Sequence, residues 1–588
     1  MTVTGRITLF LWVLLTAWGA HTQEWDAVEA GAVRDGKTDN TAVFQRLLDK
    51  AGEMGGGTVK VPSGRYRVKG TLSIPGSVIL EGTFRVPPTN RRGAALDHNG
   101  SVLLAYAGRG TQEGEPFIRL DGNMATISGL IVEYPEWRQS DVPPVPYPPC
   151  VLCEGHDNVG ILNCCFVNPY EAVRFVNVAR YIVRNLYGHP SWRGLYIDAC
   201  YDIGRVENCH FWPFSVVYLQ DDPYCKWINT YGVAFEFART DWQYVLNTFC
   251  FGYGVGYKFS QSKHGACNGN FLGIGADSCR RGVLVEQAQS AGLLITNGEF
   301  VGRWGSADSV CVEIGKEARG KVSLANCSFW GPNDRCVWHR SPEAQFTATG
   351  CHFGEYDVNG MGVPAVQIDA SKAILQGNTF GEGVLHAQIG KDVQSAILIG
   401  NQATTGFHAE NNAGERTQLL SNEKDPVVWT DEARAHYRIN IGSPGDGRYL
   451  RRWHPRESGG GRVGHKATCR WSTTSSMLHL PVLPHTEYTV IVDVRPSQHA
   501  ASEEAGIYLG RERLAGLPVN RDTLVVRIPP LDTDYAVIEL RCEDWRPADQ
   551  TEGSVDSRTL GVMFYAVTVR AENAGDRIFN ANTGRWIE

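Results

Sequence analysis

The chain has 588 residues, of which 43% are hydrophobic and 20% charged, a composition typical of folded globular proteins. Its formal net charge of −7 argues against nucleic acid as a partner, because a protein that holds phosphates needs a basic surface. The 65 glycines and the 10% of aromatic residues indicate many turns and many strands.

Residues 1–22 have the features of an export signal. Arg6 precedes the apolar run ITLFLWVLLTAWGA, and polar residues begin at His21. This run is short for a membrane span, and the small residues of AWG or GAHT offer a cleavage site. We expect a secreted or periplasmic protein with no membrane span after cleavage; an uncleaved anchor is the alternative.

The next segment predicts a helix followed by a strand. Thr38, Asp39 or Asn40 can cap the helix, and the glycines at 55–57 end it before the strand TVKVP. Its apolar stripe consists of Val43, Phe44, Leu47 and Leu48. Because a stack of parallel strands exposes an open edge, we expect this helix to cap one.

A short turn recurs through the middle of the chain. Its copies are NCCF at 163, NCHF at 208, NGNF at 268, NGEF at 297, NCSF at 326, GCHF at 350 and GNTF at 377. Each lies between two alternating strands, and the period is roughly 22 to 30 residues, which is one coil of a solenoid. Asn tolerates the left-handed corner, and each Phe is expected to stack on the Phe of the next coil. The repeat predicts an all-β fold, a right-handed parallel β-helix over residues 23–410.

The cysteines follow the same repeat. The members at the turn position are Cys164, Cys209, Cys327 and Cys351. We therefore expect a stack of buried small apolar residues, while one or two disulfides remain open. Cys150 and Cys153 form a single C-x-x-C, which lacks the second pair or the His that a metal site needs.

The opening of the predicted β-helix resembles a known family. GAVRDGKTDNTAVFQRLLDKA at 31–51, followed by GGGTVKVPSGRYRV at 55–68, is similar to the start of the pectate-lyase-like β-helix superfamily, which includes rhamnogalacturonases and epimerase-like proteins. The resemblance implies the β-helix fold and an activity on polysaccharides. It leaves the reaction open, because members include hydrolases, lyases and epimerases. It also implies structural roles for Asp35 and Asp39.

The coil signature ends near residue 410. Residues 411–430 are predicted to be a connector. Residues 431–588 hold longer alternating strands, such as TEYTVIVDV and YAVIELRC, with Pro-rich turns between them. This pattern predicts an accessory β-sandwich of jelly-roll type, which either binds sugar or docks on the helix.

Outward side chains of neighbouring coils should lie only ~4.8 Å apart and line a groove suited to a polymer. The second outward position of each coil places Asp198 and Glu236 in one mainly acidic column. The column is Asp121, Glu154, Val176, Asp198, Glu236, Lys258, Glu286, Glu313, His339 and Asp369. Outward carboxylates are usually only solvated, and from Glu286 onward no insertion lies beside the column.

An insertion at 212–231 follows the middle of this column. SVVYL within it is either a further strand or, as we prefer, part of a loop over the groove. QDD at 220–222 resembles the paired-Asp motif of polygalacturonases, although that family's N-T-D, G-H-G and R-I-K motifs are missing here. Asp221 and Asp222 are therefore candidates on chemistry alone. Aromatic rings beside carboxylates suit sugars. The predicted binding residues are Glu154, Arg174, Tyr196, Lys258, Trp192, His189, Trp227 and Asp241.

These residues favour an exported glycoside hydrolase that acts on a polysaccharide without a cofactor. The catalytic candidates are Asp198, Glu236, Asp221 and Asp222. Carboxyls on adjacent strands lie near the ~5 Å of retaining enzymes, and an intervening strand brings them to the ~6.5–9.5 Å of inverting ones.

Two alternatives stay open. A lyase would act on uronate polymers by β-elimination, with Lys258 or Arg174 near the carboxylates and Ca²⁺ as a possible cofactor. A non-catalytic sugar-binding or adhesin module would use the same fold. The polysaccharide and the oligomeric state are left open.

Overall fold

The computed structural model describes residues 23–85, 99–213, 222–303, 308–331, 333–358, 361–381, 383, 385–404, 406–458, 468–495, 498–517, 522–550, 556 and 558–587. The predicted export signal at 1–22 and the candidate Asp221 lie outside these residues. The chain divides into two compact units, 1–275 and 276–588. Within the described ranges, every helix is too short or too polar to cross a membrane.

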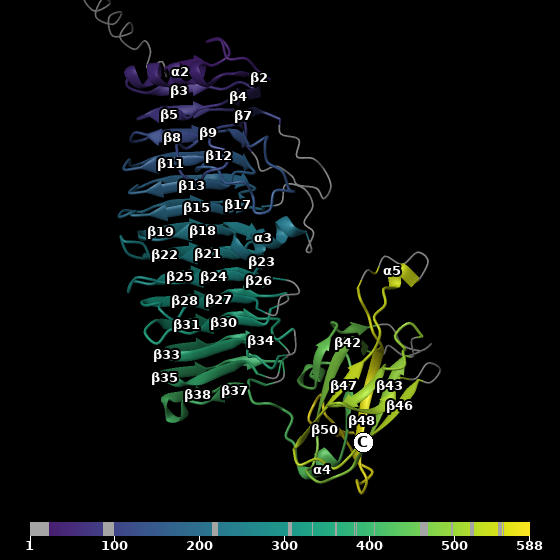
Figure 1. The fold of residues 1–588 in the computed structure, drawn as a ribbon. Helices are drawn as coiled ribbons and strands as arrows, with labels where there is room; N and C mark the ends of the chain where they lie inside the picture. Colours follow the sequence, from purple (N-terminus) through teal and green to yellow (C-terminus); the bar gives the residue numbers. More distant parts are fainter. Residues whose placement is uncertain are drawn as a thin grey trace, which may run out of the picture. The chain divides into compact units, whose positions relative to one another are not determined.

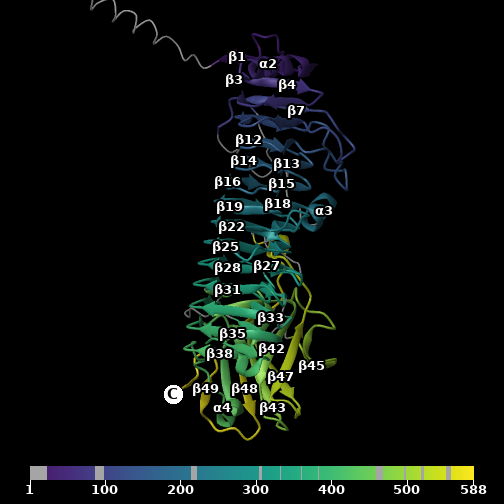
Figure 2. The same ribbon diagram turned by 90° about the vertical axis from the view of Figure 1, so that its left-hand side faces the viewer.

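Parallel strands wind through the first unit (Figures 1 and 2), as the turn repeat predicts, but they form three ladders and not the two strands per coil that we expected. The first ladder contains β1 (Glu24–Asp26), β3 (Gly57–Lys60), β6 (Val78–Glu81), β9 (Thr126–Ser128), β12 (Gly160–Val167), β14 (Ile182–Gly188), β16 (Arg205–Glu207), β19 (Thr240–Leu246) and β22 (Cys267–Leu272). The second contains β2 (Asp35–Asp39), β4 (Gly64–Val68), β7 (Ser101–Ala105), β10 (Ile131–Glu133), the ends of β12 and β14, β17 (His210–Phe211) and β20 (Phe249–Phe251). The third contains β5 (Leu72–Pro75), β8 (Ile118–Asp121), β11 (Val151–Glu154), β13 (Glu171–Val176), β15 (Arg193–Asp198), β18 (Val233–Phe237) and β21 (Val255–Phe259).

The predicted helix is α2 (Thr41–Glu53), at the N-terminal end of these coils (Figure 1). It buries Phe44, Leu47, Leu48 and Ala51. Its first N–H is bound by Asp39, whose Oδ1 accepts from the Thr41 nitrogen at 3.1 Å. Asp35 accepts from the backbone nitrogens of Lys37 and Thr38, both at 2.8 Å. Both aspartates therefore hold the local backbone, while the capping role of α2 stays a prediction.

The left-handed backbone predicted for the turn asparagines is present at Asn163 and Asn208, and also at Asn185, which the repeat did not include; Asn268, predicted as a corner, instead lies inside β22. Asn163, Asn185 and Asn208 have φ of 52°, 55° and 50°. Their side chains bond from coil to coil, because Asn185 Nδ2 donates to Asn163 Oδ1 and Asn208 Nδ2 to Asn185 Oδ1, each at 2.7 Å. Each corner thus satisfies its own side-chain donors within the stack.

The second unit continues with parallel strands in the same three-ladder pattern (Figure 1). Its strands are β23 (Gly275–Cys279, starting at the boundary), β24 (Arg281–Val285), β25 (Leu293–Thr296), β26 (Glu299–Gly302), β27 (Val310–Ile314), β28 (Lys321–Ala325), β29 (Ser328–Phe329), β30 (Arg335–His339), β31 (Gln345–Thr349), β32 (His352–Phe353), β33 (Val366–Gln376), β34 (Thr379–Phe380), β35 (Ala387–Ile399), β36 (Gln402–Ala403), β37 (Ala409–Asn411) and β38 (Thr417–Leu420), with η1 (Gly414–Arg416) between the last two. Parallel pairing therefore extends past residue 410.

The predicted phenylalanine stack is confirmed in this unit. The rings of Phe329 and Phe353 lie 4.8 Å apart, and those of Phe353 and Phe380 also lie 4.8 Å apart. The four turn cysteines are buried, and all sixteen cysteines are free thiols. The Phe and Cys residues of the repeated turns therefore pack inside the coils, as predicted.

His386 follows this stack, and its burial leads us to expect that acid destabilises the folded protein. Its ring is buried, its Nδ1 accepts from the His408 nitrogen at 2.9 Å, and burial lowers its pKa to about 4. The unfolded chain takes up this proton near pH 6.5, but the folded chain does not, so stability falls as pH drops from 6.5 to about 4, by about 3 kcal/mol. Urea denaturation at pH 7 and pH 4.5 measures the loss.

The matched control replaces an exposed histidine. His386→Gln is expected to shrink the stability difference between the two pH values, and His485→Gln, on the surface, to leave it unchanged. Equal pH dependence in the wild-type and His386→Gln proteins contradicts the assignment.

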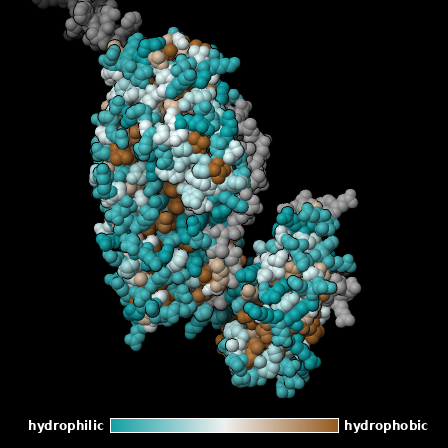
Figure 3. All heavy atoms as spheres, in the orientation of Figure 1, coloured by the Kyte–Doolittle hydropathy of each residue, from teal (hydrophilic) through white to brown (hydrophobic). Residues whose placement is uncertain are grey.

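Residues 431–587 form antiparallel strands around one apolar core that includes Tyr437, Val490 and Phe564. The strands are β39 (His436–Asn440), β40 (Leu450–Trp453), β41 (Glu457–Ser458), β42 (Thr468–Pro481), β43 (Tyr488–Arg495), β44 (Gly506–Leu509), β45 (Glu512–Gly516), β46 (Thr523–Ile528), β47 (Tyr535–Arg541), β48 (Met563–Ala571), β49 (Ile578–Asn580) and β50 (Arg585–Ile587). The helices are α4 (Asp431–Ala435), η2 (Asp446–Arg448) and α5 (Pro547–Gln550). Only β39 and β49 pair in parallel among the described strands here. The jelly-roll sandwich stays a prediction. The visible surface is mainly hydrophilic with small hydrophobic patches (Figure 3).

Candidate active site

The outward face of the third ladder in the first unit carries most of the predicted site residues. Its register pairs Val176 with Asp198, but pairs Tyr196 with Glu236 and Glu236 with Lys258. The predicted column is therefore wrong by two residues between Asp198 and Glu236. A shift of two keeps every side chain on the same face, so the alternation of the sequence does not reveal it.

The predicted outward column is also misaligned in the second unit. Glu313 pairs with Trp338, and His339 pairs with Ile314 instead. His339 is fully buried, with its ring inside the coil. It therefore does not belong to the outward column.

The insertion adds no strand to the third ladder, since β15 pairs directly with β18. Asp198 and Glu236 consequently lie on adjacent strands. Its described part forms α3 (Pro223–Tyr231), and Asp222 caps this helix by accepting from the nitrogens of Tyr224 and Cys225 at 2.9 and 3.1 Å. Trp227 packs on Tyr231 along α3. The structure thus gives Asp222 and Trp227 contacts within α3.

Five charged side chains alternate in sign across β13, β15, β18 and β21, and we call them the charge ladder. They are Arg174, Glu171, Arg193, Glu236 and Lys258. Glu171 is 1% exposed and accepts from Arg174 Nε at 3.1 Å and from Arg193 Nη2 at 2.8 Å. Glu236 lies 3.2 Å from Arg193 Nη1 and 3.6 Å from Lys258 Nζ.

Aromatic rings enclose the centre of the charge ladder. The Arg193 guanidinium lies 4.5 Å from the Trp192 ring and 4.2 Å from the Tyr196 ring. Trp192 in turn stacks on Tyr170 at 5.2 Å. Cation–π contacts and two ion pairs therefore fix the guanidinium, so its charge has a defined position at the surface.

Asp198 lies beside the charge ladder and is 6% exposed. Its Oδ1 accepts from Ser262 Oγ at 2.7 Å, from the Ala199 nitrogen at 2.8 Å and from the Arg239 nitrogen at 3.1 Å. Its Oδ2 lies 3.5 Å from the Tyr196 hydroxyl. Oδ1 of Asp198 thus holds three donors, which orient the residues around it, while Oδ2 has one distant contact.

Tyr196 connects the two groups. Burial, followed by the carboxylates of Asp198 and Glu236, raises the pKa of its hydroxyl to about 12. A phenol with this pKa keeps its proton at any physiological pH, so the Tyr196 hydroxyl is available as a hydrogen-bond donor.

The remaining predicted residues lie apart from this contact network. Asp241 pairs with Arg239 and accepts from Asn268 at 3.2 Å, and Glu154 is half-exposed, 3.6 Å from Arg119. His189 is buried against the Trp212 carbonyl. The sequence analysis missed Glu171, Ser262 and Arg239. Glu171 opens β13 one position before the alternating run, and nothing in the sequence connects Ser262 to Asp198.

The donor set does not suit Ca²⁺. Glu171 and Glu236 each meet two cationic groups, and Asp198 accepts from four donors. Across the described ranges, no three His, Cys, Asp or Glu side chains are grouped to hold a metal. We derive no step through a metal.

The N-terminal part of the chain is similar to known proteins. Residues 26–128 match the family model described as rhamnogalacturonase A/epimerase, pectate lyase-like. Over 117 residues the chain is 32% identical to mannuronan C5-epimerase AlgE5 of Azotobacter vinelandii, which is 18% of this chain and 12% of that protein. Over 47 residues it is 51% identical to alginate lyase 7 of the same organism, which is 8% of this chain and 6% of that protein.

Among solved structures, the A-module of the A. vinelandii mannuronan C-5 epimerase AlgE6 aligns with a TM-score of 0.40 and 16% identity, over 68% of this chain and 96% of that one. The chain thus spans 12% and 6% of the two curated relatives. The family match ends at residue 128, before the charge ladder begins.

Proposed function

We propose that this chain, whose residues 26–128 match the rhamnogalacturonase A/epimerase, pectate lyase-like family model, modifies a uronate-containing polysaccharide on the third ladder of its first unit. The observation that carries this proposal is the charge ladder. Its three cations, Arg174, Arg193 and Lys258, are groups that can pair with the carboxylates of an anionic sugar. The relatives whose names mention mannuronan and alginate support the same substrate class.

The proposed reaction begins at the carbon that carries the uronate carboxylate. The Asp198 carboxylate, whose Oδ2 has the Tyr196 hydroxyl 3.5 Å away, accepts the proton from this carbon. The negative charge left on the uronate carboxylate oxygens is stabilised by Arg174 and Arg193. Tyr196 then supplies a proton, either to the leaving glycosidic oxygen in β-elimination or to the carbon in epimerisation. Lys258, the predicted base of the lyase alternative, is held by Glu236 at 3.6 Å, so we assign it to charge neutralisation.

Hydrolysis by Asp198 and Glu236 is the competing function. It requires one carboxyl that carries a proton for the leaving oxygen. Glu236 instead makes ion pairs with Arg193 and Lys258, and Asp198 accepts from four donors. These contacts favour proton transfer at carbon over hydrolysis.

A product assay separates the reactions. The protein is incubated with mannuronan, polygalacturonate and a neutral glucan, in water and in deuterated water. Rising ultraviolet absorbance reports elimination, and deuterium at carbon in uncleaved polymer reports epimerisation. Either result on a uronate polymer supports the proposal. New reducing ends without absorbance support hydrolysis, and retention on the polymer without product supports a binding module.

Amide variants provide the second comparison. If hydrolysis is the reaction, Glu236→Gln is expected to lower the rate at least ~10²-fold on acidic and neutral polysaccharides alike, because the Glu236 carboxyl transfers the proton itself. Under our proposal, Glu236→Gln instead weakens binding of uronate polymers, because the positions of Arg193 and Lys258 loosen. A rise in KM with little change in kcat distinguishes the second case.

A further inference from the structure

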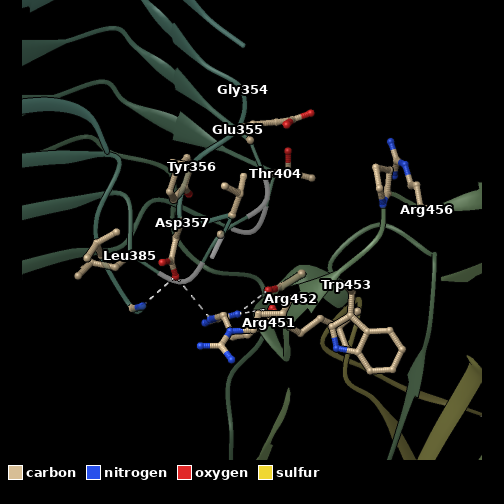
Figure 4. A pocket seen from close by; sticks show the side chains of 18 of the residues that line it. Gly354, Glu355, Tyr356, Asp357, Leu385, Thr404, Arg451, Arg452, Trp453 and Arg456 are labelled. Carbon is tan, nitrogen blue, oxygen red and sulfur yellow. Dashed lines mark hydrogen bonds and ion pairs between the residues drawn. The ribbon is translucent and has the colours of Figure 1, made fainter. Parts of the chain in front are cut away.

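The second unit contains a cavity of about 1150 Å³ that the proposed function does not use. Loops of the parallel coils form one wall, and β40 with the chain after it forms another (Figure 4). Sites for small molecules measure about 300–1,000 Å³, so this cavity accommodates several sugar rings. The residues that matter for its chemistry are Trp330, Asp357, Arg451, Arg452 and Arg456.

Arg451 presents a donor into this cavity. Its side chain is 10% exposed, and its Nη1 donates to the carbonyls of Gly447 and Leu450 at 3.1 and 2.6 Å. Its Nε lies 3.9 Å from Asp357 Oδ2, beyond hydrogen-bonding distance. Nη2 has no hydrogen-bond partner among the described residues, so the guanidinium retains a donor for a ligand.

The Arg451–Asp357 pair leaves both charges incompletely compensated. Burial lowers the pKa of Arg451 and raises the pKa of Asp357, although the backbone nitrogens of Met361 and Gly362 donate to Asp357 at 2.7 and 3.0 Å. A ligand carboxylate at Nη2 would compensate the guanidinium without displacing Asp357.

The backbone of β40 is irregular beside Arg451. The register with β42 shifts between Arg451 and Trp453, and the residue between them, Arg452, has φ of 61°. A left-handed arginine is costly, and bulges commonly redirect side chains beside functional sites. Arg456 and Trp453 project from the following stretch (Figure 4).

Trp330 supplies an apolar surface. Its side chain is 46% exposed, and Nε1 donates to Glu299 Oε1 at 2.8 Å, which fixes the orientation of the ring. Trp453, in contrast, packs edge-on against Phe564 at 4.9 Å. Of these two rings that line the cavity, Trp330 is therefore the one whose face remains exposed for a sugar to stack on.

We propose that this cavity binds an acidic oligosaccharide, with one sugar ring on Trp330 and its carboxylate on Arg451. The site stands apart from the charge ladder, and its occupation does not depend on the reaction proposed there. It would hold a second segment of a uronate polymer, or a product, on the second unit.

Hydrogen–deuterium exchange of the full-length protein tests this site, because it locates binding in the chain. Trimannuronate is expected to slow exchange in peptides covering 447–458 and 352–358, and neutral cellotriose and inorganic phosphate are expected not to. Protection by phosphate alone indicates a simple anion site, and equal protection by cellotriose indicates that the carboxylate is irrelevant. Either result, or no protection, overturns the proposal. Because the readout lies in the second unit, it is independent of activity.

Two variants assign the contacts. Trp330→Ala is expected to weaken trimannuronate binding at these peptides about tenfold. Arg451→Gln is expected to reduce the preference for trimannuronate over cellotriose. Trp242→Ala is the matched control, since Trp242 is 48% exposed and does not line the cavity. If Arg451→Gln unfolds, Trp330→Ala still decides, and unchanged affinity in that variant refutes the site.

Discussion

Tyr196→Phe is expected to lower turnover on a uronate polymer by about 10²-fold or more, because it removes the only atom to which we assign proton donation. The ring and its contact with Arg193 at 4.2 Å remain, so binding is expected to change little. The measurement is kcat and KM for absorbance or deuterium uptake, whichever product the wild-type protein forms. A fall in kcat without a rise in KM is the expected result.

Tyr201→Phe is the matched control for this loss. Tyr201 lies three residues after the end of β15, half-exposed beside Arg239, and its hydroxyl lies 3.5 Å from His264 Nδ1. We assign it no proton transfer, so turnover is expected to stay within about twofold. Equal losses in both variants would mean that hydroxyls in this region act through packing, and the assignment of Tyr196 would fail.

Glu171→Ala is expected to destabilise the first unit by about 3 kcal/mol. Glu171 is 1% exposed and binds both Arg174 and Arg193, and its removal leaves Arg193, itself largely buried, with Glu236 as its remaining carboxylate. The cost arises from the guanidinium that stays behind without its strongest acceptor. Urea denaturation followed by tryptophan fluorescence measures the change in unfolding free energy.

A surface ion pair serves as the comparison. Glu207→Ala removes the partner of Arg184, which lies 2.7 Å away on a more exposed part of the same unit. The expected cost is below about 1 kcal/mol, because water replaces the lost contact. Glu171→Gln keeps a hydrogen-bonding side chain and should fall between the two. If Glu171→Ala costs no more than Glu207→Ala, the charge ladder does not stabilise the fold.

The two predictions concern one arrangement. Arg193 positions its charge for the substrate only while Glu171 and Glu236 hold it between Trp192 and Tyr196. Weakening the ladder through Glu171 is therefore expected to raise KM as well as lower stability, whereas Tyr196→Phe is expected to leave stability nearly unchanged. Measuring KM and the free energy of unfolding for both variants distinguishes a residue that holds the site in place from one that takes part in the reaction.

Local residues were sufficient to predict the coils. Asn163 and Asn208 tolerate left-handed corners, Phe353 stacks on its counterpart one coil away, and Cys327 fills a buried small space, each for reasons carried by that residue and its repeat. Phe44, Leu47 and Leu48 likewise identified the buried face of α2 from helical periodicity. Such features depend on a few adjacent side chains, so they are readable from the chain.

The site was only partly readable. Tyr196, Glu236 and Lys258 were recognised because alternation places them on the outward face, but their register against Asp198 was wrong. Strand ends set that register, and an error of two residues preserves the alternation. Asp222 was predicted as a catalytic candidate from the QDD resemblance and from its carboxylate. A carboxylate before Pro223 also fits a helix cap, and only the presence of α3 decides between the two roles.

Residue patterns were enough to predict the periodic part of this protein, which is the all-β coil with its corners, its stacked interior and its outward polar face. The tertiary structure alone decided which charges meet. Glu171 and Glu236 reach Arg193 from different coils, and Ser262 reaches Asp198 from 64 residues away. Ion pairs and hydrogen bonds act only over a few ångströms, so contacts between coils depend on strand register and loop path, which no local pattern encodes.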